Sequence, residues 1–147
     1  MNSAFCVAVH ALVYLNHRDE MLSSDELAHN ICTNPARVRK IMASLKKAGL
    51  IETKEGHVGG YRFSCAADAL TLDRVAQALD IRFVEANWRS GDSDMECLIA
   101  SGMSGLLDDI LDDLDTRCRE RLRQISIADL DQKIFDKQKA PEMHETV

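Results

Sequence analysis

Several features are missing from this 147-residue chain, and each absence excludes a class of protein. No apolar run reaches 18 residues, so the sequence predicts no membrane-spanning helix. The apolar start, MNSAFCVAVHALVYL, has no basic segment before it and no small-residue cleavage site after it, which indicates a helix of the mature protein. No G-x-S-x-G sequence or other catalytic constellation occurs, so we do not expect an enzyme.

The chain also lacks the cysteine spacing of a metal site or of a disulfide framework. Its cysteines are odd in number and scattered, with no C-x-x-C, at Cys6, Cys32, Cys65, Cys97 and Cys118. The five histidines show no spacing to Glu or Cys that suggests a metal. We therefore expect no metal, no cofactor and a reducing, cytoplasmic setting.

The net charge of −6 at pH 7 hides a division along the chain. Residues 1–65 hold 8 Lys and Arg against 6 Asp and Glu, whereas residues 66–147 hold 10 against 18. The segment 35–62 is the most basic, with 7 Lys and Arg and only 2 Asp and Glu. Because phosphates bind to local patches and not to a chain average, this segment is compatible with a nucleic-acid surface.

Hydrophobic periodicity and capping residues predict the elements of the chain. Ser23 or Ser24 can cap one helix, and Asn34 followed by Pro35 marks the start of the next. That helix should bury Val38, Ile41, Met42 and Leu45. The expected helices cover 4–15, 24–30, 35–47, a stretch that Thr71 caps, about 101–124, and 128–135. The expected strands are 50–54 and 61–64, with a polar loop near 88–95 and a disordered tail from 137.

Helix, capped helix, basic helix, strand, glycine turn and strand is the order of a winged helix-turn-helix. The basic helix would enter the DNA major groove, where Arg37 and Arg39 are our choices for reading bases because Arg binds guanine bidentately. The glycines of GHVGGYRF would supply positive φ angles and let the wing approach the sugar-phosphate wall. The candidate DNA-binding residues are Ser24, Asn34, Pro35, Arg37, Arg39, Lys40, Ser44, His57, Gly59, Gly60, Tyr61 and Arg62.

The stretch LKKAGLIETKEGHVGGYRFSCAADALTLDRVAQAL resembles the Rrf2 family of bacterial transcription regulators. Its A-G-L-I…G-x-x-G-G-Y core and its T-L-D-x-V-x-x-A-L helix carry the resemblance, which covers about residues 1–82 well. The resemblance implies a homodimeric winged-helix protein, usually a repressor, whose long C-terminal helix crosses that of its partner. Residues 1–82 would be the DNA-binding domain, 83–136 the linker loop and dimerisation helices, and 137–147 a tail. A two-fold dimer implies a near-palindromic operator.

The chain departs from the family at its cysteines. Many members hold an iron–sulfur cluster on three closely spaced cysteines before the long helix, whereas Cys97 stands alone there, so we expect a cluster-free member. Cys32 precedes the basic helix, whose dipole and Arg37 could lower the thiol pKa, and Glu96 should raise the pKa of Cys97. One hypothesis is that an intersubunit Cys32–Cys97 disulfide releases the regulator from DNA; the other is that neither thiol senses anything.

Two further interpretations stay open from the sequence. A repressor of this family could respond to a small metabolite instead of an oxidant. Winged helices also serve as protein-interaction modules without DNA binding, a function that the acidic C-terminal half would suit.

Overall fold

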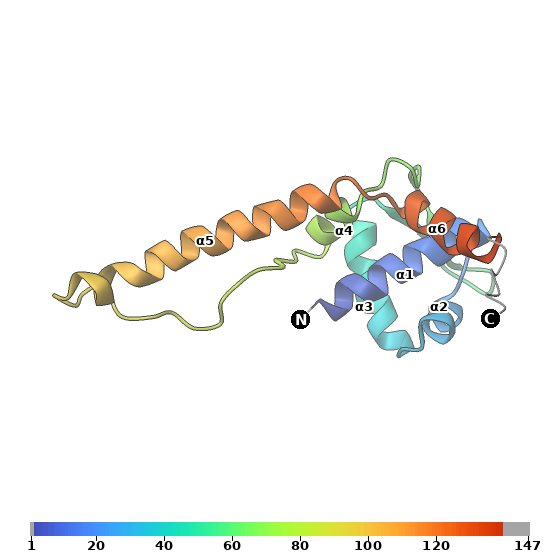
Figure 1. Ribbon diagram of the computed structural model, residues 1–147. Helices are drawn as coiled ribbons and strands as arrows, with labels where there is room; N and C mark the ends of the chain where they lie inside the picture. The colour runs from blue at the N-terminus through green and yellow to red at the C-terminus, as the bar shows by residue number, and fades with distance from the viewer. Residues whose placement is uncertain (1, 140–147) are drawn as a thin grey trace, which may run out of the picture.

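Six helices and two strands follow one another through residues 2–139, which are the residues that the computed structural model describes. They are α1 Ser3–Arg18, α2 Ser24–Ile31, α3 Pro35–Lys47, β1 Ile51–Lys54, β2 Gly60–Phe63, α4 Leu72–Ala78, α5 Leu98–Leu122 and α6 Ile127–Lys139. All except α5 gather into a body, and α5 projects from it as a long arm (Figure 1). This mainly helical winged-helix architecture confirms the fold expected from the sequence.

Side-chain caps fix the starts of α2, α3 and α4, as the sequence predicts. Ser23 and Glu26 form a reciprocal capping box on α2, with hydrogen bonds of 3.1 Å to Ser23 Oγ and 2.7 Å to the Glu26 carboxylate. Asn34 Oδ1 accepts the backbone N–H of Ala36 (2.7 Å) at the start of α3. Thr71 Oγ1 accepts the N–H of Arg74 at α4. Ser23 is therefore the cap of α2, and Ser24 is its first helical residue.

The hydrophobic core lies where α1 meets α3 and α6. The predicted inward residues of α3, Val38, Ile41, Met42 and Leu45, are all buried, against a face of α1 that includes Ala8, Ala11, Leu12 and Leu15. Ile127, the first residue of α6, is completely buried in the same core. The chain therefore returns to the body after the arm. Because α6 continues to Lys139, the predicted tail start at Lys137 is too early, and residues 140–147 lie outside the described residues.

Several predicted boundaries differ from the observed ones for local reasons. α1 continues to Arg18 and ends where Asp19 adopts a left-handed conformation (φ 47°) that lets its N–H bond to the carbonyl of Leu15. The long helix begins at Leu98 and not near Ser101, because it continues without a break through the small residues that follow. β2 begins at Gly60 and ends at Phe63, so Ser64 lies outside it.

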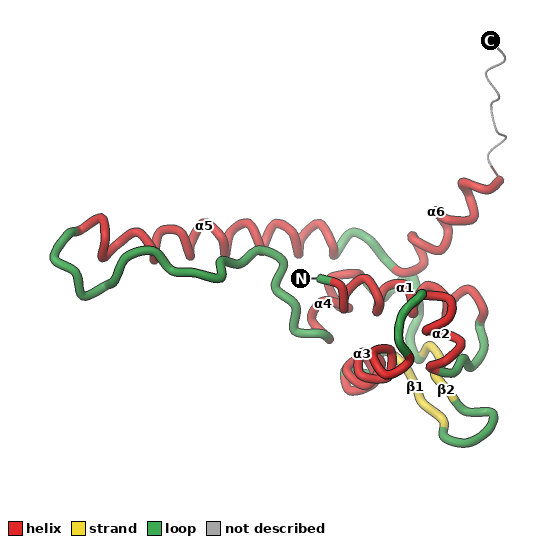
Figure 2. Tube along the Cα trace, turned by 90° about the horizontal axis from the view of Figure 1, so that it is seen from below, coloured by secondary structure: helices red, strands yellow, loops and turns green. Residues whose placement is uncertain are grey.

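The loop between α4 and α5 runs outward beside the arm to its free end, where α5 begins (Figure 2). The Asp115 carboxylate accepts the backbone N–H groups of Phe83 (2.7 Å) and Val84 (3.0 Å), and Arg89 pairs with Asp108 at 2.5 Å. The loop thus occupies Asp108 and Asp115 of α5, whereas Asp109 and Asp113 and the apolar side chains of the helix stay exposed. Within residues 2–139, no helix combines the length and apolarity needed to cross a membrane.

A buried carboxylate joins the base of the arm to the body. Asp73 of α4 is only 3% exposed and accepts hydrogen bonds from Nε of Arg119 (2.9 Å) and Nε of Arg123 (3.1 Å), both near the end of α5. Burial alone would raise the pKa of Asp73, but the two guanidinium groups outweigh it, so the pKa lies below its ordinary value. The arm therefore leaves the body at a position that an ionised Asp73 holds.

We expect Asp73→Asn to lower the free energy of unfolding at neutral pH by about 1.5–3 kcal/mol, because charged hydrogen bonds to a buried carboxylate are lost. A carboxyl with a lowered folded-state pKa stabilises the fold above its ordinary value of about 3.9, and this contribution is lost as the pH falls through the folded-state pKa. The difference between variant and wild type in urea unfolding should therefore shrink on acidification below about pH 4.

Asp113→Asn is the matched control, since Asp113 pairs with Arg117 on the exposed surface of the same arm. We expect it to change stability little. Equal stability of the Asp73→Asn variant and the wild type at neutral pH would contradict a structural role for the buried carboxylate.

Candidate nucleic-acid interface

α3 turns its cations away from the core. Arg37, Arg39 and Lys40 are exposed, whereas Val38 and Ile41 between and beside them are buried. α3 and the β1–β2 hairpin lie along one edge of the body, on the opposite side from the arm (Figure 2). The predicted recognition helix and wing therefore border the same surface, which is open to solvent in the monomer.

The arginines of α3 are held by hydroxyl groups and not by carboxylates. Arg37 Nη2 donates to Ser3 Oγ of α1 at 2.6 Å, and Arg39 Nη1 donates to Ser24 Oγ at 3.3 Å. Among residues 2–139, neither arginine forms an ion pair within 4.0 Å, and Lys40 forms none. Their positive charges are therefore positioned but not neutralised, and an approaching phosphate would meet them directly.

The other candidates on α2 and α3 position the helix more than they extend from it. Asn34 uses its side-chain oxygen on the helix cap, and Pro35 occupies the first helical position. Ser44 is half-buried in the third turn of α3. Ser24 supports Arg39. Asn34 and Pro35 thus fix the N-terminus of α3, where backbone N–H groups and the helix dipole favour an anion.

The wing glycines have reasons inside the protein. β1 pairs antiparallel with β2 from Ile51↔Phe63 to Lys54↔Gly60. On the other side of β2, Leu22 and Tyr61 exchange backbone hydrogen bonds of 3.0 and 2.8 Å. A Cβ atom at Gly60 (φ 151°) would lie 2.4 Å from the carbonyl oxygen of Leu22, and one at Gly59 would lie 2.1 Å from that of Lys54. Close backbone packing therefore requires both glycines, independently of any approach to DNA.

The remaining wing residues divide between support and exposure. Tyr61 is half-buried, and burial raises its pKa while the nearby charge of Arg39 acts in the opposite direction. His57 and Arg62 are exposed, with Arg62 opposite Glu52 in the strand register. Tyr61 thus ties the wing to the body, and His57 and Arg62 remain available for contacts.

Two exposed residues of the hairpin were not among the candidates from the sequence. Val58 is 82% exposed between the glycines at the tip, and Lys54 is exposed at the end of β1. The signal for Lys54 was its place in the basic segment 35–62. For Val58 the only signal is its position inside the glycine turn.

The two cysteines predicted to pair lie apart within one chain. Cys32 is exposed in the α2–α3 turn in a left-handed conformation (φ 63°), whereas Cys97 is exposed at the N-terminus of α5. Figure 1 shows α2 and the free end of α5 at opposite ends of the molecule. Hydrogen bonds from the backbone N–H groups of Ala100 and Ile99 lower the pKa of Cys97. The expectation that Glu96 raises this pKa is therefore wrong, because the helix terminus dominates.

We expect Cys97 to alkylate at a lower pH than Cys65, whose pKa is raised by partial burial against a smaller opposing effect of Arg74. Iodoacetamide reacts with thiolates, so mass spectrometry of labelled peptides across a pH series should give a midpoint for Cys97 below that for Cys65. Both thiols are measured in one molecule, and Cys97→Ser identifies the early-reacting site. Coincident midpoints would contradict the assignment.

Known proteins share both the sequence and the shape of this chain. The Bacillus subtilis protein YwnA, named as an HTH-type transcriptional regulator, is 27% identical over 138 residues, which cover 92% of this chain and 99% of YwnA. A Lactobacillus plantarum protein described as a transcriptional regulator superposes with a TM-score of 0.78 at 29% identity, over 91% of each chain. CymR of B. subtilis, at 20% identity over 90% of this chain and 96% of CymR, shares the fold with a TM-score of 0.64.

The model of the family Rrf2, described as an iron-dependent transcriptional regulator, matches residues 1–133. The donor groups of this chain do not fit an iron centre, because no three His, Cys, Asp or Glu residues in the described part come together to hold a metal. Cys97 is also the single cysteine between Cys65 and Cys118. Sequence and fold agree over nearly the whole chain, and the protein belongs to the Rrf2 family of transcriptional regulators.

Proposed function

We propose that the protein is a sequence-specific DNA-binding regulator that represses transcription as a homodimer. The observation that carries the proposal is the set of uncompensated cations on α3, beside the hairpin on one edge of the body. The N-terminal part of α3 would enter the major groove, with Arg37 and Arg39 at base edges and Lys40 at a phosphate. His57 and Arg62 of the wing would contact the adjacent backbone.

The arm supports the homodimer. Its outer face carries apolar side chains in solvent at helical spacing, among them Leu98 (86% exposed), Leu106, Ile110 (55% exposed) and Leu114. A contiguous apolar face of this length marks an association surface. A second arm crossing it would bury these residues and give the pair two-fold symmetry. Two recognition helices related in this way call for a near-palindromic operator.

We expect Arg37→Ala and Arg39→Ala each to weaken operator binding by about 1–3 kcal/mol and to relax specificity at the base that the residue reads. Both side chains are exposed, so the fold should survive. Operators are first selected from genomic fragments, and affinity is then measured by fluorescence anisotropy at several salt concentrations, because released counterions make the affinity fall with salt.

Arg74→Ala is the matched control, since Arg74 is an exposed arginine of α4 outside the candidate interface. It should bind the operator as the wild type does. Wild-type operator affinity in both the Arg37→Ala and Arg39→Ala variants would remove α3 as the reading helix.

A thiol switch is the form of release that we propose. The Cys97 thiolate of one subunit would attack a peroxide, forming a sulfenic acid and releasing water or an alcohol. The Cys32 thiol of the other subunit would then displace water to form the disulfide, so two thiols are oxidised as the peroxide is reduced. The lowered pKa of Cys97 suits it to the first step. A bond at Cys32 would pull on the turn immediately before α3.

We expect peroxide to convert the wild type into a covalent dimer on non-reducing gels and to reduce its operator affinity. Cys32→Ser and Cys97→Ser should each prevent the covalent dimer, because either change removes one half of the bond. Cys6→Ser removes another exposed cysteine and serves as the matched control that still cross-links. A covalent dimer in the Cys32→Ser variant would end the pairing.

A further inference from the structure

An apolar groove of about 800 Å³ lies between the outer face of α1 and α6, and we call it the α1–α6 groove. Its apolar walls are Phe5, Val9 and Val13 of α1 and Leu130, Ile134 and Phe135 of α6. A volume of this size and a mostly apolar lining are typical of pockets that hold small organic ligands. None of the candidate DNA-binding residues lines the groove, so it is a separate surface.

The polar groups around the groove are neutral or cationic. They are Cys6, His10, Tyr14, His17, Asn30, Lys133 and Lys137, and no Asp or Glu is among the lining residues, although the chain has 24 Asp and Glu against 18 Lys and Arg. Lys133 and Lys137 lie one turn apart on α6, and like charges at this spacing repel. Neither forms an ion pair within 4.0 Å in the described part of the chain.

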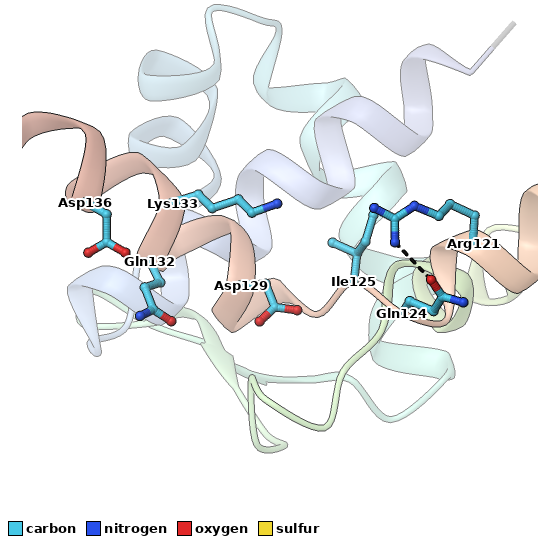
Figure 3. Close-up of a pocket in the computed structure, with 7 residues that line it drawn as sticks. All are labelled: Arg121, Gln124, Ile125, Asp129, Gln132, Lys133 and Asp136. Carbon is cyan, nitrogen blue, oxygen red and sulfur yellow. Dashed lines mark hydrogen bonds between the residues drawn. The ribbon is translucent and has the colours of Figure 1, made fainter. Parts of the chain in front are cut away.

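Two carboxylates of α6 have hydrogen-bond partners outside the groove, and the pKa of Asp129 is lowered by hydrogen bonds from Ser126 and also by the charge of nearby Lys133. Asp131 accepts a hydrogen bond from Asn16 (2.8 Å) and lies 3.2 Å from Nδ1 of His17. Asp129 accepts the backbone N–H of Ser126 in the cap of α6. Lys133 also borders a polar hollow of about 380 Å³ that Asp129 and Asp136 line, and Figure 3 shows its side chain pointing away from Asp136.

One end of the groove is already held in shape. The rings of His17 and Phe135 stack with centroids 4.0 Å apart and an angle of 9° between their planes. The Asp131 carboxylate lies 3.2 Å from Nδ1 of the same imidazole and helps to hold it. The aromatic wall is therefore already ordered before a ligand binds, which lowers the entropic cost of binding.

We propose that the α1–α6 groove binds a small amphipathic anion, namely a monocarboxylate with an apolar chain or ring body. Phe5, Val9 and Ile134 would cover the apolar body of the ligand. Lys133 and Lys137 would donate charge-assisted hydrogen bonds to its carboxylate, which removes their mutual repulsion. This binding does not depend on the proposed contact with DNA, because the two surfaces share no residue.

Cys6 provides a probe inside the groove, since it is exposed and lines it. The full-length reduced protein is treated with N-ethylmaleimide in the presence and absence of decanoate, and mass spectrometry follows each thiol. Decanoate should slow modification of Cys6 several-fold and leave Cys32 unchanged as the internal control. Decanol should protect Cys6 less, and decyltrimethylammonium should not protect it, because the lysines favour an anion.

The charge requirement is tested by the double variant Lys133→Gln, Lys137→Gln. Calorimetry should show about a tenfold loss of decanoate affinity, which is the effect expected when charged hydrogen bonds are lost. Lys54→Gln is the matched control, an exposed lysine of β1 far from α6 in the sequence. It should bind decanoate as the wild type does.

Each contrary outcome overturns the proposal. Equal reactivity of Cys6 with and without decanoate would show that the ligand does not occupy the groove. Cys6 that becomes reactive only when residues 140–147 are removed shows that the chain's own C-terminal segment fills the groove. Cys6 whose protection rises with protein concentration and not with decanoate shows that a second copy fills it. Operator binding measured in parallel keeps a failure here distinct from a failure of the DNA proposal.

Discussion

The attachment of the arm to the body depends on one buried carboxylate. Asp73 lies on the short helix that follows the wing, and it receives both Arg119 and Arg123 from the end of α5. An uncharged or smaller group would leave two guanidinium groups at a packed junction without a partner. The direction of the arm, and with it the separation of two recognition helices in the proposed dimer, is set at this point. In the proposed dimer, a residue outside the candidate interface would therefore constrain how the two recognition helices contact DNA.

The body transmits that geometry to α3 through packing. Val38, Met42 and Leu45 are completely buried against α1, so α3 cannot rotate about its axis without exposing them. Because the apolar stripe is fixed inward, Arg39 and Lys40 are fixed outward. α1 thus supports α3 on one face and borders the α1–α6 groove on a neighbouring face.

Sequence reasoning recovered the features that short-range chemistry controls. Asn34-Pro35 and the spacing of Val38, Ile41 and Met42 gave α3 its observed bounds and its buried face. It could not recover contacts between distant segments. The pairing of Leu22 with Tyr61, which is the reason that position 60 must be glycine, joins residues 39 positions apart. The lowering of the Cys97 pKa by the N-terminus of α5 could not be predicted without knowing where α5 begins. The assignment of roles to the candidate interface residues remains a prediction.

The loop that lies beside α5 has a consequence for stoichiometry. Asp108 and Asp115 are occupied by their own chain, whereas the apolar side chains of the helix are left open to another molecule. A helix with several association surfaces could bind further copies without limit, whereas a helix with one apolar association surface is saturated by one partner in a closed dimer. In the proposed assembly, the single apolar face on each arm therefore favours a closed dimer over an open filament.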